Sequence, residues 1–427
     1  MFVLSAFRFG YGLHFIDVED LRNSRSHVYP VLKHNCPYFA LYDMLKKVLS
    51  RLDGLVLMFL ALMSLVVPKK RKTIAFVSFR SSGLYGGNLK PVFRVMGDFF
   101  PDFDAFWVAR TKNTRIIVNS DGGRAVLNRL FWVIPILRAE WVFVDHVRTP
   151  LAIGRFRFIQ LWHGTGFKNI GIRHQFRSWV SAWLVVRYGR MTELLIATSK
   201  EDAQRKKESL AVKNVRITGA PRVDVLLQNR FATGFESPKR KSLVVYVPTH
   251  RDGGWQEQPF SKKEWRQLDR LLGEHDAEMV VKRHPSDKTL LVPADLRLIR
   301  DVTEEVQDVQ DLILEGDLFI SDYSGIVTDI VLTGKPIVWF MPDFHSYNSV
   351  RRDFYYDFPD VLPGPIANGF DDLAVKLFDL TWFKENDYQS CYEAFSNRFH
   401  EFPDGGATRR VAEEFESLLR AQDLNHS

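Results

Sequence analysis

The 427-residue chain has little cysteine, no export signal and no long hydrophobic run. Its two cysteines, Cys36 and Cys391, are too few for a disulfide framework or a cysteine-built zinc site, which is typical of a reducing compartment. The first twenty residues lack a basic stretch followed by an apolar core, so we predict no secretion. The best apolar run, Leu55 to Val67, gives roughly 20 Å of helix against about 30 Å of hydrocarbon. A single transmembrane span is therefore not expected.

The overall composition is that of a folded protein with a basic surface. Hydrophobic residues make up 46% and charged residues 26%, which excludes wholesale disorder, and the length favours two domains. The net charge of +7 favours anionic partners such as phosphates, nucleic acid or a membrane surface. We expect no nucleic-acid partner, because the charge is spread along the chain and no known nucleic-acid module is visible.

Two segments have the character of membrane-surface helices. Lysines and arginines at 46–51 and 69–72 flank the run Leu55 to Val67, which suits either an interfacial helix on anionic headgroups or a buried helix of a domain. The segment 173–190 mixes arginines with Phe176, Trp179 and Trp183, which share one helical face. This second segment fits a helix lying on a membrane or a helix packed on a core.

Short apolar runs alternate with helical stretches along the rest of the chain. The runs are at 73–79, 103–109, 141–146, 156–163, 194–199 and 215–219, and again at 242–249, 278–285, 296–299, 317–324 and 336–340. This alternation indicates parallel sheets covered on both faces. We therefore predict an α/β protein with an N-terminal helical segment (1–72), a first domain (73–227), a polar linker (228–241) and a second domain (242–427) that faces the first across a cleft.

Polar motifs follow five of these strands, where open α/β folds bind ligands. His163 lies between Trp162 and two glycines, and its imidazole suits a general base at neutral pH. Lys282, Arg283 and His284 would contact a polyanion. For His163 the alternative is a hydrogen-bonded histidine of the core or of a loop, and for the basic group at 282–284 it is a solvated basic edge.

A third motif, DYSGIVTD at 322–329, predicts a strand that turns into a helix. We expect Ser324 or Asp322 to cap this helix and the amides of residues 325–327 to bind a phosphate. A plain helix cap would explain the serine equally well. The pair Asp102 and Asp104 falls in a turn, so we expect no metal there, and no cofactor elsewhere.

Together these motifs resemble the CDP-glycerol glycerophosphotransferase family of teichoic acid primases and polymerases. The motifs are WHGTGFKNIG at 162–171, TGAPRVD at 218–224, YVPTHRD at 246–252, KRHP at 282–285 and ISDYSGIVTD at 320–329. The resemblance implies a GT-B fold with two Rossmann-like domains and a CDP-activated polyol phosphate donor. It also implies a lipid-linked saccharide or polymer as acceptor, and peripheral attachment to the cytoplasmic face of the cell membrane.

The resemblance also assigns roles to residues. His163 and His284 match the family's catalytic histidines, and Ser324 matches the first of two serines beside the donor pyrophosphate. Gly325 replaces the second serine, and His250 stands where tryptophan is common. The donor site would comprise Thr249, Arg251, Asp252, Lys282, Arg283, Asp322, Ser324, Gly325 and Thr328, with supporting loops at Gly164, Thr165, Gly219, Pro221 and Arg222.

The expected reaction is metal-independent transfer of a polyol phosphate, glycerol phosphate first of all, with release of CMP, in the synthesis of a teichoic-acid-like or capsule polymer. His163 would deprotonate or orient the acceptor hydroxyl, and His284, Arg251, Lys282 and the helix after Ser324 would stabilise the leaving charge. Three alternatives stay open: a GT-B glycosyltransferase that uses a nucleotide sugar, a non-enzymatic protein that binds membranes or polyanions, and, last, a nucleic-acid binder.

Overall fold

The computed structural model divides the chain into two compact units, Met1–Val56 and Leu57–Ser427. The structure describes residues 54–55, 57–79, 84–127, 134–167, 169–173, 179–230, 241–251, 258–284, 287, 289–306, 308–344, 347, 355 and 361–426. The two sheets and the helices around them belong to the second unit. Most of the predicted N-terminal segment 1–72 lies outside the described residues.

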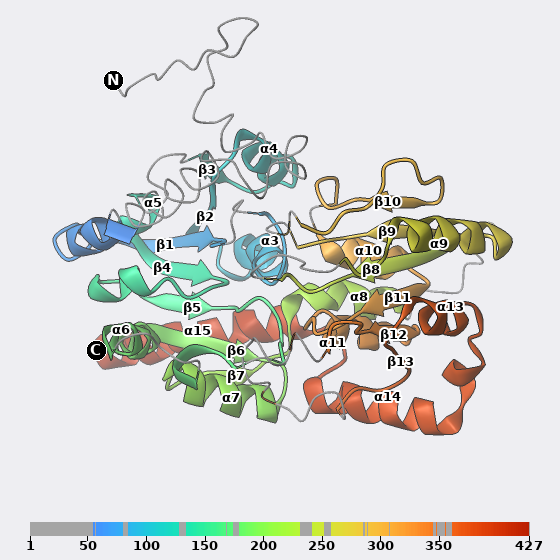
Figure 1. The fold of residues 1–427 in the computed structure, drawn as a ribbon. Helices are drawn as coiled ribbons and strands as arrows, with labels where there is room; N and C mark the ends of the chain where they lie inside the picture. The colour runs from blue at the N-terminus through green and yellow to red at the C-terminus, as the bar shows by residue number, and fades with distance from the viewer. Residues whose placement is uncertain are drawn as a thin grey trace, which may run out of the picture. The chain divides into compact units, whose positions relative to one another are not determined.

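A seven-stranded parallel sheet forms the first half of this unit (Figure 1). Its strands are β1 (Lys70–Val77), β2 (Asp104–Ala109), β3 (Ala125–Leu127), β4 (Ala139–Val144), β5 (Phe158–Gln160), β6 (Thr192–Ala197) and β7 (Val215–Ile217). The spatial order is β3-β2-β1-β4-β5-β6-β7. The order reverses between β1 and β4, which is where a doubly wound sheet opens a crevice for ligands.

Helices and 3₁₀ turns connect these strands. They are α3 (Leu89–Phe99), α4 (Lys112–Ser120), α5 (Ile134–Leu137), η1 (Thr149–Ile153), η2 (Gly171–Arg173), α6 (Trp179–Arg190), α7 (Lys200–Leu210), η3 (Pro221–Val223) and α8 (Asp224–Arg230). Buried clusters lie on both faces of the sheet because alternate side chains of β1 point to opposite sides: Ile74 and Phe76 join one cluster, and Ala75 and Val77 the other.

A second, six-stranded parallel sheet repeats the pattern. Its strands are β8 (Ser242–Val247), β9 (Ala277–Val281), β10 (Ile299–Asp301), β11 (Leu318–Ser321), β12 (Ile337–Phe340) and β13 (Ile366–Ala367), in the order β10-β9-β8-β11-β12-β13. The connecting elements are α9 (Lys262–Glu274), α10 (Val309–Glu315), α11 (Val327–Ile330), η4 (Val331–Thr333), α13 (Phe370–Phe378), η5 (Thr381–Lys384), α14 (Asn386–Phe399) and α15 (Ala407–His426). Two parallel sheets confirm the predicted α/β class.

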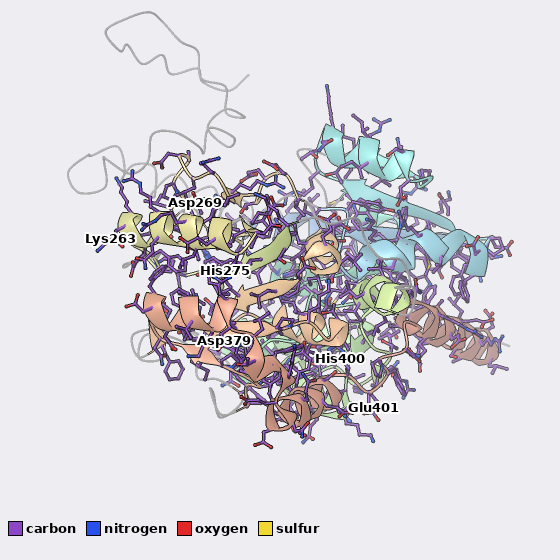
Figure 2. The ribbon with its side chains drawn as sticks, turned by 90° about the vertical axis from the view of Figure 1, so that its right-hand side faces the viewer. Lys263, Asp269, His275, Asp379, His400 and Glu401 are labelled. Atoms are coloured by element: carbon purple, nitrogen blue, oxygen red, sulfur yellow. The ribbon has the colours of Figure 1, made fainter. Side chains whose placement is uncertain are left out.

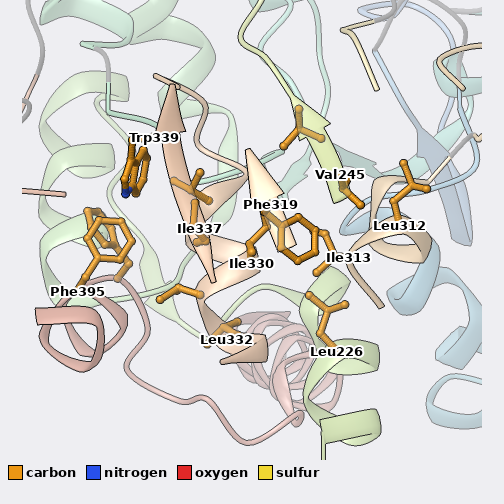
Figure 3. Packing of buried hydrophobic residues seen from close by; sticks show 14 of the residues in the cluster. Leu226, Val245, Leu312, Ile313, Phe319, Ile330, Leu332, Ile337, Trp339 and Phe395 are labelled. Carbon is orange, nitrogen blue, oxygen red and sulfur yellow. The ribbon is translucent and has the colours of Figure 1, made fainter. Parts of the chain in front are cut away.

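Helices from several parts of the chain cover one face of the second sheet. Figure 3 shows Val245 and Phe319 on the strands with Leu226 of α8 and Ile330 of α11 beside them, and Trp339 next to Phe395 of α14. Although α8 follows the last strand of the first sheet, its Leu226 is buried in the second-sheet cluster.

The last helix, α15, packs against the first sheet, although it follows the second sheet in sequence. Val411, Ala412 and Phe415 of α15 are fully buried in the cluster of the first sheet. Phe415 contacts the rings of Trp141 and Phe143 edge-on. The chain therefore returns to its first half at its end, whereas residues 242–427 were assigned as a block to the second domain. The domain boundaries stay a prediction.

Local sequence misses the shortest elements. β3 and β13 have three and two residues, too few for an apolar run to stand out, and β10 begins where the predicted strand 296–299 ends. Helix α8 also continues to Arg230, past the predicted start of the linker at residue 228. Residues 231–240 of that linker are outside the described part.

The two membrane-like segments are helices with one buried and one exposed apolar side. In the helix over residues 57–63, Leu57, Leu60 and Ala61 are buried, whereas Phe59 is 63% exposed. In α6, Tyr188 is buried and Trp179 is 80% exposed. Phe176 is outside the described residues. None of the described helices combines the length and apolar character that a membrane crossing requires.

Candidate active site

Polar groups follow the strands at their carboxyl ends, as the sequence predicts. In the first sheet Asp145 follows β4, His163 follows β5 and Ser199 follows β6. In the second sheet Thr249 follows β8, His284 follows β9 and Asp322 follows β11. Because carboxyl ends of parallel strands share one edge, each sheet presents its polar loops on a single edge.

The ring of His163 is held by two groups that follow β4. Its Nδ1 lies 3.1 Å from the backbone oxygen of Asp145, and its ring stacks on His146 with centroids 3.8 Å apart and planes 6° apart. Because a carbonyl oxygen can only accept, Nδ1 carries the hydrogen, and Nε2 of the neutral ring is left as the acceptor. The half-buried ring therefore has the tautomer that a general base needs.

The loop after β5 is fixed by partners that sequence analysis did not select. Asn88, the residue before α3, donates from Nδ2 to the backbone oxygens of Leu161 (2.7 Å) and Trp162 (3.1 Å). The Thr165 hydroxyl lies 3.0 Å from that of Thr198. Each of these polar side chains is buried, so each needs a partner, and together they determine the path of the loop around His163.

A buried cluster of charged side chains on α7 also contacts the loop that carries His163. Asp202 pairs with Arg205 (3.0 Å) and Lys206 (2.7 Å), and all three are at most 2% exposed. Burial alone would raise the pKa of Asp202, but the two cations outweigh it and hold that pKa below its usual value. Burial lowers the pKa of Lys206. Arg205 also donates to the backbone oxygen of Gly166, so the cluster is tied directly to the loop.

The loop after β11 differs from the predicted helix cap. Helix α11 begins at Val327, is four residues long and has Ile326, not Ser324 or Asp322, at its N-cap position. The Ser324 hydroxyl receives only a long bond, 3.5 Å, from the amide of Ile326. Among the described residues the backbone N–H groups of Ser324 and Gly325 have no acceptor, so the open N–H donors lie in the turn itself and not at the start of the helix.

Gly325 brings this turn against the loop that follows His163. A Cβ placed on Gly325 would lie 2.5 Å from the oxygen of Thr165 and 3.0 Å from Cα of Gly166. Only a residue without a side chain permits this approach. The serine typical of the family at this position would therefore not fit, and two motifs 160 residues apart in sequence are in direct contact.

Arg251 and Asp322, both predicted to contact the donor, lie in a buried network. The Arg251 guanidinium pairs with Asp322 (2.9 Å) and with both carboxylate oxygens of Asp343 (2.8 and 3.0 Å). Burial lowers the pKa of Arg251, but the two carboxylates reverse this effect and raise it overall. Oδ1 of Asp322 accepts from the amide and the hydroxyl of Thr249 (2.8 and 2.5 Å). These residues hold the loops after β8 and β11 together, and Asp252 is outside the described residues.

The basic group after β9 is partly neutralised. Arg283 pairs with Asp301 through Nε (2.6 Å), and Nζ of Lys282 donates to the backbone oxygen of Thr303 (3.0 Å). Burial lowers the pKa of Lys282. His284 is exposed, and its ring lies 5.3 Å from that of His250, the residue that departs from the family's pattern. The structure thus places two imidazoles side by side at this strand end.

The remaining supporting residues gather around Arg222. Gly219 has a positive φ of 81°, which favours glycine, and Pro221 begins η3. Arg222 is 6% exposed and forms a fork with Asp329 of α11, at 2.6 and 2.7 Å. A Cβ on Gly164 would lie 4.0 Å from Nη2 of Arg222. Thr328 is fully buried, and its hydroxyl donates to the oxygen of Gly325 (2.8 Å).

The chain is similar in sequence to known teichoic acid polymerases. The chain is 27% identical over 365 residues to the teichoic acid ribitol-phosphate polymerase TarK of Staphylococcus aureus, covering 81% of this chain and 68% of that protein. It is 24% identical over 394 residues to the teichoic acid poly(glycerol phosphate) polymerase of Bacillus subtilis, covering 82% of this chain and 50% of that protein. The chain spans about half to two thirds of the length of these relatives.

Solved structures show the same fold. The wall teichoic acid polymerase TagF, in a structure soaked with CDPG, superposes with a TM-score of 0.71 at 22% identity, covering 90% of this chain and 98% of that one. Another TagF structure gives a TM-score of 0.69 at 22% identity, covering 83% and 90% of the two chains. This likeness supports a GT-B-like arrangement of the two α/β sheets.

The family model of CDP-glycerol:poly(glycerophosphate) glycerophosphotransferases matches residues 59–417, which include all five sequence motifs. The predicted family is thereby confirmed. The chain belongs to the CDP-glycerol:poly(glycerophosphate) glycerophosphotransferase family.

Proposed function

We propose that this protein transfers a polyol phosphate, most simply glycerol phosphate, from a CDP-activated donor to a hydroxyl of a lipid-linked saccharide or growing polymer, and releases CMP. The observation that carries this proposal is the approach of Gly325 to Thr165 and Gly166. It brings N–H donors suited to a pyrophosphate next to the loop that presents His163 as a base. The relatives named above are teichoic acid polymerases, which supports a teichoic-acid-like polymer as the product.

The proposed reaction uses His163 as the proton acceptor and N–H groups as hydrogen-bond donors to the phosphates. Nε2 of His163 accepts the proton of the acceptor hydroxyl, whose oxygen attacks the donor phosphorus that carries the polyol. The bond from that phosphorus to the bridging oxygen breaks, and CMP leaves with the bridging oxygen. The backbone N–H groups of Ser324 and Gly325, with His284, stabilise the negative charge that develops on the donor phosphates.

The charged residues around the donor divide into two roles. Arg251 and Asp322 satisfy each other in a buried network, so they position the loop that carries Ser324. Lys282, which donates to a backbone oxygen and keeps no buried carboxylate partner among its described contacts, supplies positive potential near His284. Thr249, Thr328 and Arg283 support these loops through the bonds described above.

Activity is tested by CMP release in the presence of a lipid-linked acceptor. The donors are CDP-glycerol, CDP-ribitol and common sugar nucleotides. We expect release from a CDP-polyol, and a loss of roughly 100-fold to 10,000-fold in His163→Asn and in His284→Asn, because each removes a proton-transfer or charge-stabilising group. His275→Asn, at the exposed end of α9 (Figure 2), is the matched control and should keep wild-type activity.

Two outcomes would contradict the proposal. Turnover of a sugar nucleotide with no turnover of any CDP-polyol would favour the glycosyltransferase alternative. Full activity in both His163→Asn and His284→Asn would remove the assigned site.

The same unit carries a surface suited to the cytoplasmic face of an anionic membrane. The helix over 57–63 and α6 flank one turn: the Ser64 hydroxyl accepts from the amide of Arg155 (2.7 Å), and Arg187 donates to the oxygen of Ala152 (2.7 Å). Large apolar groups are exposed on these two helices and in the turn after the first of them: Phe59 (63%), Leu62 (51%), Val66 (73%), Trp179 (80%) and Trp183 (49%). Tryptophan beside arginine favours the headgroup region of a bilayer.

Vesicle binding tests this surface. Replacing both Trp179 and Trp183 with alanine should weaken binding to phosphatidylglycerol-containing vesicles by at least about tenfold, because less apolar area enters the bilayer. Phe99→Ala, an exposed aromatic on α3, is the control and should bind as the wild type does. Unchanged binding of the double variant would exclude α6 as the contact.

A further inference from the structure

A continuous chain of buried polar groups joins the two loops of the candidate site. It begins at the backbone oxygens of Leu161 and Trp162, just before His163, both of which accept from Nδ2 of Asn88. Oδ1 of Asn88 accepts from the backbone amide (3.1 Å) and Nη1 (3.2 Å) of Arg222. The guanidinium then forks onto Asp329 of α11.

On the far side the chain reaches the turn that carries Ser324. Thr328, next to Asp329, donates through its amide (3.2 Å) and its hydroxyl (2.8 Å) to the oxygen of Gly325. Gln310 donates to Asp329 as well (2.9 Å), which fixes the carboxylate from a third side. The path therefore runs from the residue before the base to the residue after Ser324.

The geometry allows only one orientation of each member. Asn88 is 3% exposed; its side-chain NH₂ group donates to two carbonyl oxygens, and its side-chain oxygen accepts from two N–H groups of Arg222. If the amide were flipped, its NH₂ group would face the N–H groups of Arg222 and its oxygen would face the carbonyl oxygens, so only one orientation forms hydrogen bonds. Arg222 and Asp329 are 6% and 0% exposed, and the planar fork fixes their relative angle. A shift of the Ser324 turn would therefore move Arg222 and, through it, Asn88 and the His163 loop.

We propose that Asn88, Arg222 and Asp329 are positioning residues that couple the donor-binding turn to the orientation of His163. This inference rests on the proposed function for what the two loops bind, but the mechanical coupling is independent of it. In the absence of the coupling the base would be less well aligned with the donor phosphorus, so turnover should fall more than donor binding does.

Asp329→Asn tests the coupling with little change in shape. In hydrogen exchange we expect faster exchange in peptides that contain residues 161–166, although no hydrogen bond joins Asp329 to that loop among the described contacts. In the CMP assay we expect kcat to fall at least about tenfold while KM for CDP-glycerol changes less than about threefold.

Glu201→Gln provides the matched control. Glu201 of α7 accepts two hydrogen bonds from Arg398 of α14 (2.8 and 3.0 Å), and the substitution weakens this ion pair. Like the pair of Arg222 with Asp329, it joins an element that follows the first sheet to one of the second, but it involves neither of the two site loops. We expect wild-type exchange at 161–166 and wild-type kcat in this variant.

A double variant separates coupling from general damage. If Asn88→Ser and Asp329→Asn break one connection, the variant with both should be no more than about threefold slower than the slower single variant. The inference would be overturned if the fold decrease in kcat of the double variant equalled the product of the decreases in the two single variants. Unchanged hydrogen exchange at 161–166 in Asp329→Asn would also overturn it. Should the wild type release no CMP from any donor, the proposed function would fail, and the exchange result would still decide the coupling.

Discussion

At the scale of single residues, Gly325 determines how closely the two site loops approach. Its backbone lies against Thr165 and Gly166, and a Cβ there would lie 2.5 Å from a backbone oxygen that no side-chain rotation can move away. The departure from the family's serine thus has a steric cause in this chain, and the hydroxyl that is lost is replaced by a tighter contact between loops.

Gly325→Ser should separate these loops. We expect the free energy of unfolding to fall by about 1–3 kcal/mol, because overpacking displaces backbone, and CMP release to fall with it. Urea denaturation and the activity assay measure the two effects. Gly97→Ser, which adds the same side chain to α3 where no atom lies within 4 Å, should change neither by much. A fully stable and active Gly325→Ser variant would contradict the close packing of the loops.

At the scale of elements, the end of α14 is attached to α11 by one buried histidine. His400 follows the last residue of α14, is 5% exposed, and its Nε2 lies 2.6 Å from the backbone oxygen of Thr328 (Figure 2). Nε2 must therefore carry the hydrogen of a neutral ring. Burial lowers the pKa of His400 below 6.5, so the folded protein resists its protonation.

This predicts an acid-sensitive contact. As the pH falls below about 6.5 the unfolded chain binds a proton at His400 that the folded chain does not, so the free energy of unfolding decreases by up to about 1.4 kcal/mol per pH unit until the folded pKa is reached. Above pH 6.5 both states are neutral and the effect vanishes.

His400→Gln keeps a donor for Thr328 but cannot be protonated. Urea denaturation between pH 5 and 7.5 should show a smaller loss of stability on acidification for this variant than for the wild type. His275→Gln, at the exposed position labelled in Figure 2, should follow the wild-type curve. Parallel curves for the wild type and His400→Gln would contradict the assignment.

At the scale of the whole unit, the two ends of its sequence share one core. Phe415 of α15 is fully buried against Phe100 and Trp141 of the first sheet layer, with ring centroids 5.1 and 5.0 Å away. The helix is therefore part of the first core although it follows the second sheet in sequence.

Phe415→Ala should destabilise the unit by about 3–5 kcal/mol, because it leaves a cavity among aromatic rings. Denaturant unfolding measures the loss. Leu424→Ala, on the same helix but 78% exposed, should stay within about 0.5 kcal/mol of the wild type. Similar effects of the two substitutions would show that α15 does not depend on the first sheet.

Patterns in the sequence were enough to predict the α/β class, most strands, the polar groups at their ends and the family. Apolar runs and strand-end motifs are local properties, because neighbours in sequence share one strand or one loop. Elements of two or three residues, such as β3 and β13, carry too little pattern to be recognised.

The hydrogen-bond partners of the groups that support the site became visible only in the folded structure. Asn88 reads as an ordinary turn residue, Arg222 and Asp329 are 107 positions apart, and Asp202 reads as a surface residue of a charged helix. The cap expected at Ser324 was wrong for the same reason, since the partners of Asp322 come from another strand. A buried polar group must form its hydrogen bonds with whatever groups the fold brings next to it. Which groups these are depends on how the sheets and helices pack, and the partners can be far apart in the sequence.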